Sequence, residues 1–345
     1  MESATGSHGS KPFTHVIGWI GLGSMGTGMA SRIQKTLSES CSQPLRVYNR
    51  TASRCAPLEE LGAQRRDTVG QLAQDCDIIF LSSSADSAIT SIVDQVIVSG
   101  NIQGKIVVDT TTVHPDTSKA VSAKLSAHEA HFAAMPVFGA SPAAAAGTVL
   151  AAFAGPEVVL KTVSPLLKGV LAREVLVVGL EPEKALLLKT TGNLLMASLM
   201  QIIAEAHVFA SKTGLPEATL ERLLELNFGP VAHTDSIRMT TGVYCPGEGQ
   251  APWSDLDLAI KDVGHAIEIA KREGVSLRAG QVAYEGLGKA KVWANSEGKA
   301  NSEGQGKRLD STSLFGVVRE ESGLDFKSDF VKARDGKGQK PSDST

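Results

Sequence analysis

The residues of this chain that are best suited to chemistry begin with a glycine-rich turn. Gly21-Leu22-Gly23-Ser24-Met25-Gly26 follows the apolar segment HVIGWIG and leads into a helical segment. In a G-x-G-x-x-G turn between a strand and a helix, the first glycine allows a tight turn, the second lets the backbone approach a pyrophosphate, and the third lets the helix pack closely on the strand. The amides and the dipole of the helix N-terminus then hold the phosphates. We therefore predict that these six residues bind a dinucleotide.

The end of the second predicted strand bears on which dinucleotide is bound. An NAD-binding fold places Asp or Glu about 20 residues further on, where the carboxylate accepts a hydrogen bond from the ribose 2′-hydroxyl. Here the chain reads Val47-Tyr48-Asn49-Arg50-Thr51, without a carboxylate. Asn49, Arg50 and Thr51 offer an amide, a guanidinium and a hydroxyl, which suit a 2′-phosphate. The sequence favours NADP(H) over NAD(H); the alternative for Arg50 is a solvated charge at a strand end.

A lysine and an asparagine stand four residues apart in a long apolar segment. Lys189 and Asn193 share one face of a helix predicted over residues 182–213, so both side chains can reach one cleft. A lysine is costly to bury in such a segment, although its ammonium can also extend to solvent along its stem. An ammonium beside a carbonyl can stabilise the alkoxide that forms when hydride arrives, and can donate a proton to it. Lys189 and Asn193 are therefore candidate catalytic residues.

Hydroxyl side chains follow two further predicted strands. Ser82 and Ser83 end the segment DIIFLSS, and Thr110-Thr111-Thr112 follow KIVVD. Ligands of open α/β sheets bind at the carboxyl ends of the strands, so hydroxyls at these points are well placed for a ligand. We assign Ser82 and Ser83 to the cofactor and expect the threonines to take part in ligand binding.

The order of segments predicts the fold that positions these residues. From His15 onward short apolar strands alternate with helices, and strands this continuously apolar are buried on both faces of a parallel sheet. The fold class is α/β, a Rossmann-type doubly wound parallel sheet followed by an all-α second domain. The predicted parts are a disordered lead-in (residues 1–14), an NADP-binding domain (15–180), an all-helical substrate and dimerisation domain (181–330) with a flexible insertion (294–308) that holds the repeat ANSEGK-ANSEGQ, and a loose tail (331–345).

Taken in order along residues 15 to about 290, the motifs resemble the β-hydroxyacid dehydrogenase family. That family includes 3-hydroxyisobutyrate dehydrogenase, tartronate semialdehyde reductase, glyoxylate/succinic semialdehyde reductases and, more distantly, 6-phosphogluconate dehydrogenase. GLGSMGTGMA is similar to its cofactor turn, Asp109–Pro115 to its D-x-S-T-V-x-P, Lys189–Asn193 to its catalytic K-x-x-x-N, and Lys261-Asp262 to its K-D pair. The resemblance implies that Thr112 lies against the nicotinamide, that Thr111 faces the substrate and that Lys261 reaches the cofactor.

The substrate segment departs from the pattern of that family. Met135-Pro136-Val137-Phe138-Gly139-Ala140, followed by Gly147-Thr148, is similar to D-A-P-V-S-G-G-x-x-G-A-x-x-G-T-L, in which Ser-Gly-Gly holds a substrate carboxylate. Here Ala134 replaces the Asp, Phe138 the Ser and Ala140 the second Gly. We assign Phe138, Gly139, Ala140, Thr111 and Asn193 to substrate binding, and we expect a bulkier or less acidic substrate than a small hydroxy acid.

The resemblance implies an NADP(H)-dependent oxidoreductase that acts on CH–OH groups. Hydride would pass between the nicotinamide and a carbonyl or hydroxy-acid substrate, with Lys189 as proton donor or acceptor. One alternative is an imine reductase, a related group whose proton donor is generally Asp or Tyr; the apolar Ala134 and Phe138 would suit a cyclic imine. A non-catalytic binding homologue is a further alternative. Substrate, direction of reaction and the function of the hexapeptide repeat stay open.

Composition excludes several other classes. The net charge of −3 gives no field for nucleic acid, and no uncharged apolar run reaches the roughly 18 residues that span a bilayer. Four scattered cysteines without Cys/His ligand spacing argue against a disulfide scaffold and against a metal site. His207, His233 and His265 are interpreted as ordinary structural histidines. We interpret the cysteines as reduced thiols of a cytoplasmic protein. We also expect a homodimer or homotetramer, because the helix 182–213 is apolar nearly all round.

Overall fold

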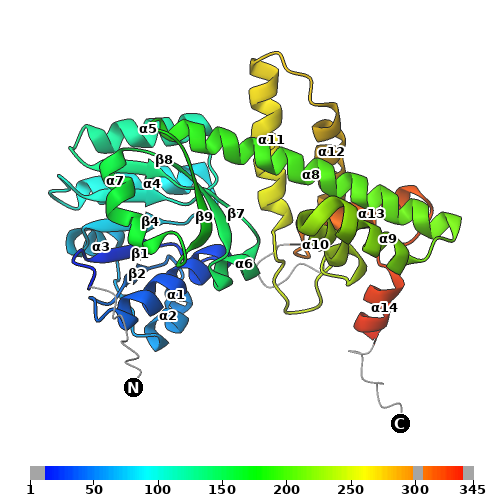
Figure 1. Ribbon diagram of the computed structural model, residues 1–345, viewed down its shortest axis with the longest axis horizontal. Helices are drawn as coiled ribbons and strands as arrows, with labels where there is room; N and C mark the ends of the chain where they lie inside the picture. The colour runs from blue at the N-terminus through cyan, green and yellow to red at the C-terminus, as the bar shows by residue number, and fades with distance from the viewer. Residues whose placement is uncertain (1–11, 298–305, 337–345) are drawn as a thin grey trace, which may run out of the picture. The chain divides into compact units, whose positions relative to one another are not determined.

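The computed structural model describes residues 12–297 and 306–336 of the 345-residue chain, which divides into two compact units, Met1–Lys189 and Thr190–Thr345 (Figure 1). The change in composition predicts a boundary between residues 180 and 181, whereas the division lies within a helix, after Lys189. The described part begins at Pro12, and the rest of the predicted lead-in lies outside the described residues. Phe13 packs against a core cluster and donates its backbone N–H to Ser42 Oγ at 2.8 Å.

The first unit is built on one sheet of mixed but mostly parallel strands. Its order is β3-β2-β1-β4-β5-β6-β8-β7, with β9 paired to β8. The pairs from β3 through β6 are parallel and β8 is antiparallel to both β6 and β7. The strands are β1 (Ile17–Ile20), β2 (Arg46–Tyr48), β3 (Gln64–Arg65), β4 (Ile78–Leu81), β5 (Ile106–Asp109), β6 (His131–Ala134), β7 (Val137–Phe138), β8 (Val149–Ala154) and β9 (Ala172–Gly179).

Helices cover both faces of this sheet, as the continuously apolar strands predict (Figure 1). Alternate strand residues point to opposite faces, so Trp19 and Phe80 belong to one core cluster while Ile20 and Leu81 belong to the other. The helices of the first cluster are α1 (Ser24–Glu39), α2 (Ala56–Glu60), α6 (Ser141–Ala146) and α7 (Glu157–Val163), and those of the second are α3 (Val69–Asp75), α4 (Asp86–Val98), α5 (Pro115–Ser126) and the first turns of α8 (Pro182–Thr213). Short 3-10 turns η1 (Ala52–Cys55) and η2 (Ser164–Leu166) complete the unit.

The regular elements of the second unit are helices, apart from one isolated β-bridge between Asp255 and Asp310 among its described residues, which confirms the predicted all-α region. After α8 come α9 (Glu217–Leu223), the π-turn η3 (Leu224–Phe228), α10 (Gly229–Thr240), α11 (Leu256–Arg272), α12 (Arg278–Glu297), the 3-10 turn η4 (Ser311–Ser313), α13 (Leu314–Glu321) and α14 (Asp329–Gly336). Their core holds an aromatic set in which Trp293 stacks on Phe326, with ring centroids 3.7 Å apart. Tyr244 ties distant parts of the unit together, because its hydroxyl donates to Phe326 O at 2.9 Å.

Two predicted loose segments differ from what the structure contains. Residues 331–336 of the predicted tail are helical within α14, where Val331 is fully buried. The predicted insertion 294–308 starts inside α12, and Ala294 is likewise fully buried in the core. In both cases buried apolar contacts outweigh a polar local composition. Residues 298–305, which include most of the hexapeptide repeat, and residues 337–345 lie outside the described residues.

The long helix α8 matches the predicted range, residues 182–213. It is also long and apolar enough to cross a membrane by length and composition, and 44% of its most apolar 18-residue window is buried within the chain. The core helix of a globular protein meets the same criteria. The sequence argument against a membrane therefore does not extend to this helix.

Candidate active site

The glycine turn after β1 has the geometry that the G-x-G-x-x-G spacing predicts. Gly21 has a φ of +98°, and a Cβ on it would lie 1.9 Å from Ser82 O. A Cβ on Gly26 would lie 2.1 Å from Gly21 O, so this position must stay bare for α1 to pack on β1. At Gly23, the N-cap of α1, an added Cβ would meet nothing within 4 Å. The open position is therefore the one at which the motif brings a pyrophosphate close to the backbone.

Asn49 supports this turn from the end of β2. Its side-chain Oδ1 accepts a hydrogen bond from Leu22 N at 2.8 Å, and its Nδ2 donates to Thr51 O at 2.9 Å. The sequence predicts Asn49 as a cofactor ligand, and the contacts show in addition that it fixes the backbone of the turn. Trp19 contributes from within β1 by donating its indole N–H to Gly21 O at 2.9 Å.

Arg50 and Thr51 are exposed directly after β2. Within the part of the chain that the structure describes, the Arg50 guanidinium makes no hydrogen bond or ion pair with another residue. A charged group that the fold does not use is available to a ligand. Asn49, Arg50 and Thr51 thus stand at the carboxyl end of the strand next to β1, as the nucleotide prediction requires.

The loops after β4 and β5 lie at the same edge of the sheet. β4 and β5 run parallel to β1, so their carboxyl ends meet at the edge where the glycine turn lies. Between β1 and β4 the chain order reverses direction across the sheet, which is the switch point at which such sheets bind ligands. Ser83 N donates to Thr111 Oγ1 at 2.9 Å and Thr110 Oγ1 donates to Leu81 O at 2.7 Å. These bonds join the two loops that carry the predicted hydroxyls.

Asp109 is a buried carboxylate that sequence reasoning left without a role. It is 1% exposed at the last position of β5, and its Oδ1 accepts from Thr111 N at 2.9 Å. It therefore shapes the turn on which Thr111 and Thr112 lie. The signal that could have found it is an acidic residue at the end of a strand that is otherwise apolar.

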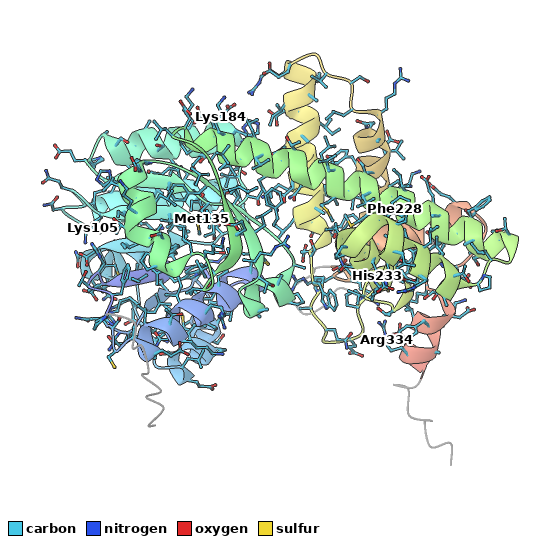
Figure 2. All side chains as sticks on the ribbon, in the orientation of Figure 1. Lys105, Met135, Lys184, Phe228, His233 and Arg334 are labelled. Carbon is cyan, nitrogen blue, oxygen red and sulfur yellow. The ribbon has the colours of Figure 1, made fainter. Side chains whose placement is uncertain are left out.

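The predicted substrate segment follows β6 and lies beyond the carboxyl end of that strand. β6 and β7 pair in succession with β8, Ala134 with Ala154 and Phe138 with Leu150, so Phe138 lies past the carboxyl end of β6. Gly139 has a φ of +137°, and a Cβ there would come within 3.2 Å of Ala143 and Val149. Ala140 is the N-cap of α6. Figure 2 shows the buried Met135 of the same segment within the strand layer.

Lys189 meets this segment. Its side chain is buried, 7% exposed, and Nζ lies 4.6 Å from the centroid of the Phe138 ring. The first turns of α8 fix this position, because Ala185 and Leu186 are fully buried against the sheet. The predicted lysine is therefore a buried ammonium at the edge that carries the other candidates of the first unit.

The candidates of the second unit form a separate group. Asn193 Nδ2 donates to Asp262 Oδ2 at 2.6 Å, and Lys261 Nζ lies 3.0 Å from Asp262 Oδ1. Asp262 is thus shared by Asn193 on α8 and Lys261 on α11, and it orients both. The sequence predicts the residue pair Lys261-Asp262, but not its contact with Asn193 from a distant part of the chain.

A second buried polar cluster lies elsewhere in this unit. Arg238 on α10 donates to Asp235 Oδ1 at 2.7 Å and to Asp310, which also accepts from Ser254 N at 2.8 Å. Burial raises the pKa of Asp235 to about 6 against the opposing effect of Arg238. His207 bonds Ser236 at 2.6 Å, and burial lowers the pKa of His207. Each of these groups has a partner within the chain, so the cluster ties helices together.

Among the described residues no group of His, Cys, Asp and Glu has the arrangement of a metal site.

Comparison with known proteins shows which enzymes the chain is similar to. Residues 16–179 match the NAD binding domain of 6-phosphogluconate dehydrogenase. The NADH-dependent oxidoreductase ucdB of Aspergillus ustus is 29% identical over 302 residues, 87% of this chain and 98% of that protein. Glyoxylate/succinic semialdehyde reductase 1 of Arabidopsis thaliana is 26% identical over 277 residues, 80% of this chain and 92% of that protein. Over most of its length the chain is therefore similar to oxidoreductases of the NAD(P)-binding β-hydroxyacid dehydrogenase type.

Solved structures agree with the fold of the chain. The 3-hydroxyisobutyrate dehydrogenase of Mycobacterium tuberculosis superimposes with a TM-score of 0.72 at 19% identity, covering 89% of this chain and 99% of that one. An imine reductase from a Pseudomonas species gives a TM-score of 0.57 at 16% identity, covering 88% and 99%. The predicted resemblance and fold class are confirmed. The residue assignments within the site stay predictions.

Proposed function

We propose that this chain belongs to the β-hydroxyacid dehydrogenase family and is an NADP(H)-dependent oxidoreductase. It would interconvert a carbonyl and the corresponding alcohol or hydroxy acid, with Lys189 as the proton donor and acceptor. The observation that carries the proposal is the buried Lys189 ammonium beside Phe138, at the sheet edge where the dinucleotide turn ends. Burying an ammonium lowers the stability of the fold. We therefore interpret the burial of Lys189 as serving a function, the donation of a proton to a developing alkoxide.

The residues of the chain divide the chemistry among them. The reduced nicotinamide, when bound, supplies hydride to the carbonyl carbon. As the C=O π bond breaks, Lys189 transfers a proton to the oxygen, and the neutral amine regains a proton from water. Thr111, fixed by its bonds to Ser83 and Asp109, would hold the polar end of the substrate. Asn193, oriented by Asp262, would orient the substrate or Lys189.

The preference for NADP(H) is supported by the loop after β2. The exposed Arg50 guanidinium and the Thr51 hydroxyl suit a 2′-phosphate, and no carboxylate follows the strand to bind a ribose 2′-hydroxyl. The relative from Aspergillus ustus is named as NADH-dependent. The preference of this chain between NADPH and NADH is therefore argued from its own residues and not from that relative.

Replacing the proposed proton donor tests the function. In Lys189→Ala, kcat for the best carbonyl substrate should fall about 100-fold to 10,000-fold, the usual contribution of a general acid, while the affinity for NADPH stays the same. The matched control is Lys184→Ala on the same helix, whose side chain is exposed and labelled near the start of α8 in Figure 2. Unchanged turnover in Lys189→Ala would contradict the proposal.

An imine reductase is the second candidate, favoured by the apolar character of Phe138 and the fully buried Ala134. NADPH consumption measured against glyoxylate, succinic semialdehyde, larger apolar keto acids and a cyclic imine separates the two. Turnover of the imine alone would support the second candidate, and turnover of carbonyl compounds the first. Lys189 supports the first, because a buried lysine can donate a proton to a carbonyl oxygen.

We also propose that the chain works in the cytoplasm as a homodimer or homotetramer. Leu195, Ile202 and Phe209 follow one another at seven-residue intervals on α8 and are 66%, 59% and 71% exposed. Such a stripe on a helix matches a second copy of itself in an antiparallel pair. Analytical ultracentrifugation of the full chain distinguishes a monomer from a dimer or tetramer.

A further inference from the structure

The contact between Lys189 and Phe138 has the geometry of a cation over an aromatic face. The distance of 4.6 Å from Nζ to the ring centroid is within the range at which the ring quadrupole attracts an ammonium. Lys189 is 7% exposed, so water screens this attraction little. The ring therefore offsets part of the cost of burying the charge.

The surrounding chain fixes the ring. Phe138 pairs with Leu150 of β8, and the left-handed backbone of Gly139 turns the chain immediately after it. On the inner side Phe138 packs against a core cluster that includes the fully buried Ala134 and Leu186. With the sheet on one side and the start of α8 on the other, the ring has little freedom to move away from Lys189.

The same ring gives this side of the site an apolar wall. A phenyl group offers a carboxylate no hydrogen bond, so a carboxylate buried against it lacks a partner there. A carbonyl substrate that carries a carboxylate against this wall would lose hydration without recovering it. An uncharged substrate would instead gain from burial of its apolar part.

We propose that Phe138 is a positioning residue that holds the Lys189 ammonium against its ring, and that its apolar surface selects an uncharged carbonyl substrate over one that carries a carboxylate. The inference rests on the proposed function, since it presumes that Lys189 protonates a carbonyl oxygen. It names the residue that places the proton donor and the class of substrate that the site accepts.

A matched pair of aldehydes tests the selection. Butanal and succinic semialdehyde share a chain length and differ in a terminal methyl or carboxylate. For the unaltered chain we expect kcat/KM for butanal to exceed that for succinic semialdehyde by about tenfold or more, which corresponds to 1.4 kcal/mol. In Phe138→Ser this ratio should fall at least about tenfold, because a hydroxyl can bind the carboxylate.

Two further variants separate positioning from selection. Phe138→Leu keeps an apolar wall but has no aromatic face, so the aldehyde ratio should persist while kcat for butanal falls about tenfold. Phe138→Tyr keeps the aromatic face, so kcat for butanal should stay within about threefold of the unaltered chain. The affinity of each variant for NADPH, measured in parallel, shows that its fold is intact.

Different outcomes test the role of Phe138 and the proposed function of Lys189. A preference of the unaltered chain for succinic semialdehyde, or an unchanged ratio in Phe138→Ser, overturns the selection. Equal kcat in Phe138→Leu and the unaltered chain overturns the positioning role. If neither aldehyde nor any other carbonyl compound is reduced, or if Lys189→Ala stays fully active, the proposed function itself fails.

Discussion

The two compact units use polar side chains in opposite ways. In the first unit the candidate ligand-binding polar groups lie in loops at the carboxyl ends of the strands, and some of them, such as Arg50, make no bond to the described chain. In the second unit Arg238, Asp235 and Asp310 are nearly fully buried and bonded to one another. The first arrangement leaves hydrogen-bonding groups available to a ligand. In the second, the charged groups bond to one another and hold the helices together.

The difference shows that burial and charge alone do not mark a functional site. Arg238 is as deeply buried as Lys189, but it is bonded to two carboxylates and to Ser311 Oγ at 3.0 Å. Lys189 lies over an aromatic ring, next to loops that end parallel strands. The position of a charge relative to the topology of the sheet is therefore the better guide.

The largest effect is expected from breaking the buried cluster of the second unit. Arg238→Leu leaves Asp235 and Asp310 buried without their common cation, and loss of one partner of a buried ion pair typically costs about 3 to 5 kcal/mol. Urea unfolding should show a free energy of unfolding lowered by that amount. The affinity for NADPH at a temperature where the variant stays folded should be unchanged, because the cluster has no ligand to hold.

The matched control is another arginine of the same unit. Arg222 is exposed and paired with Glu225 at 2.6 Å, so Arg222→Leu should leave the unfolding midpoint unchanged. If the two variants unfold alike, the cluster is not a structural tie. If Arg238→Leu stays folded but loses turnover, the contrast between the two units fails.

Intermediate effects are expected from two glycines of the cofactor turn. In Gly26→Ala the new Cβ would lie 2.1 Å from Gly21 O, so α1 must shift. Overpacking of this kind costs about 1 to 3 kcal/mol, and NADPH binding should weaken with it. In Gly23→Ala the Cβ meets no atom of the chain within 4 Å, so stability should persist while NADPH binding weakens.

Urea unfolding and cofactor titration of both variants separate geometry from ligand contact. A Gly23→Ala variant that binds NADPH as tightly as the unaltered chain would show that no pyrophosphate approaches this position. A Gly26→Ala variant with unaltered stability would show that α1 can move without cost. Either result would contradict the contrast drawn above, in which the glycine turn serves ligand binding and the Arg238 cluster serves stability.

The first unit was predictable from sequence because its determinants are local. Each strand is a short apolar run, and each functional loop follows its strand directly, so the residues 21–26, 82–83 and 110–112 could be placed at one edge from their order alone. The range 182–213 of α8 could be predicted because Pro182 and Gly214 bracket one uninterrupted helical pattern. The short terminal helix α14 could not, because its composition is polar and it depends on the burial of Val331.

The rest of the site could not be predicted because it joins distant residues. Asn193 and Asp262 are 69 positions apart and Arg238 and Asp310 are 72, and a single sequence holds no signal for such pairs. The contact of Lys189 with Phe138 is of the same kind: each residue is a candidate from sequence, but only the fold brings the ammonium over the ring. For Asn49, the sequence predicts a place at the cofactor site, but its hydrogen bond from Leu22 N is known only from the structure.

The smallest effect is expected at the surface of the cofactor edge. Removing the exposed guanidinium in Arg50→Ala should weaken NADPH binding about tenfold, because one charge-assisted bond to a phosphate is lost in water, and should leave NADH binding unchanged. Fluorescence titration of both nucleotides measures this, with Arg54→Ala as the control, an exposed arginine four positions further on. Equal weakening of NADPH and NADH would place Arg50 at a phosphate that both nucleotides share, and the chain would then lack the 2′-phosphate site that its sequence predicts.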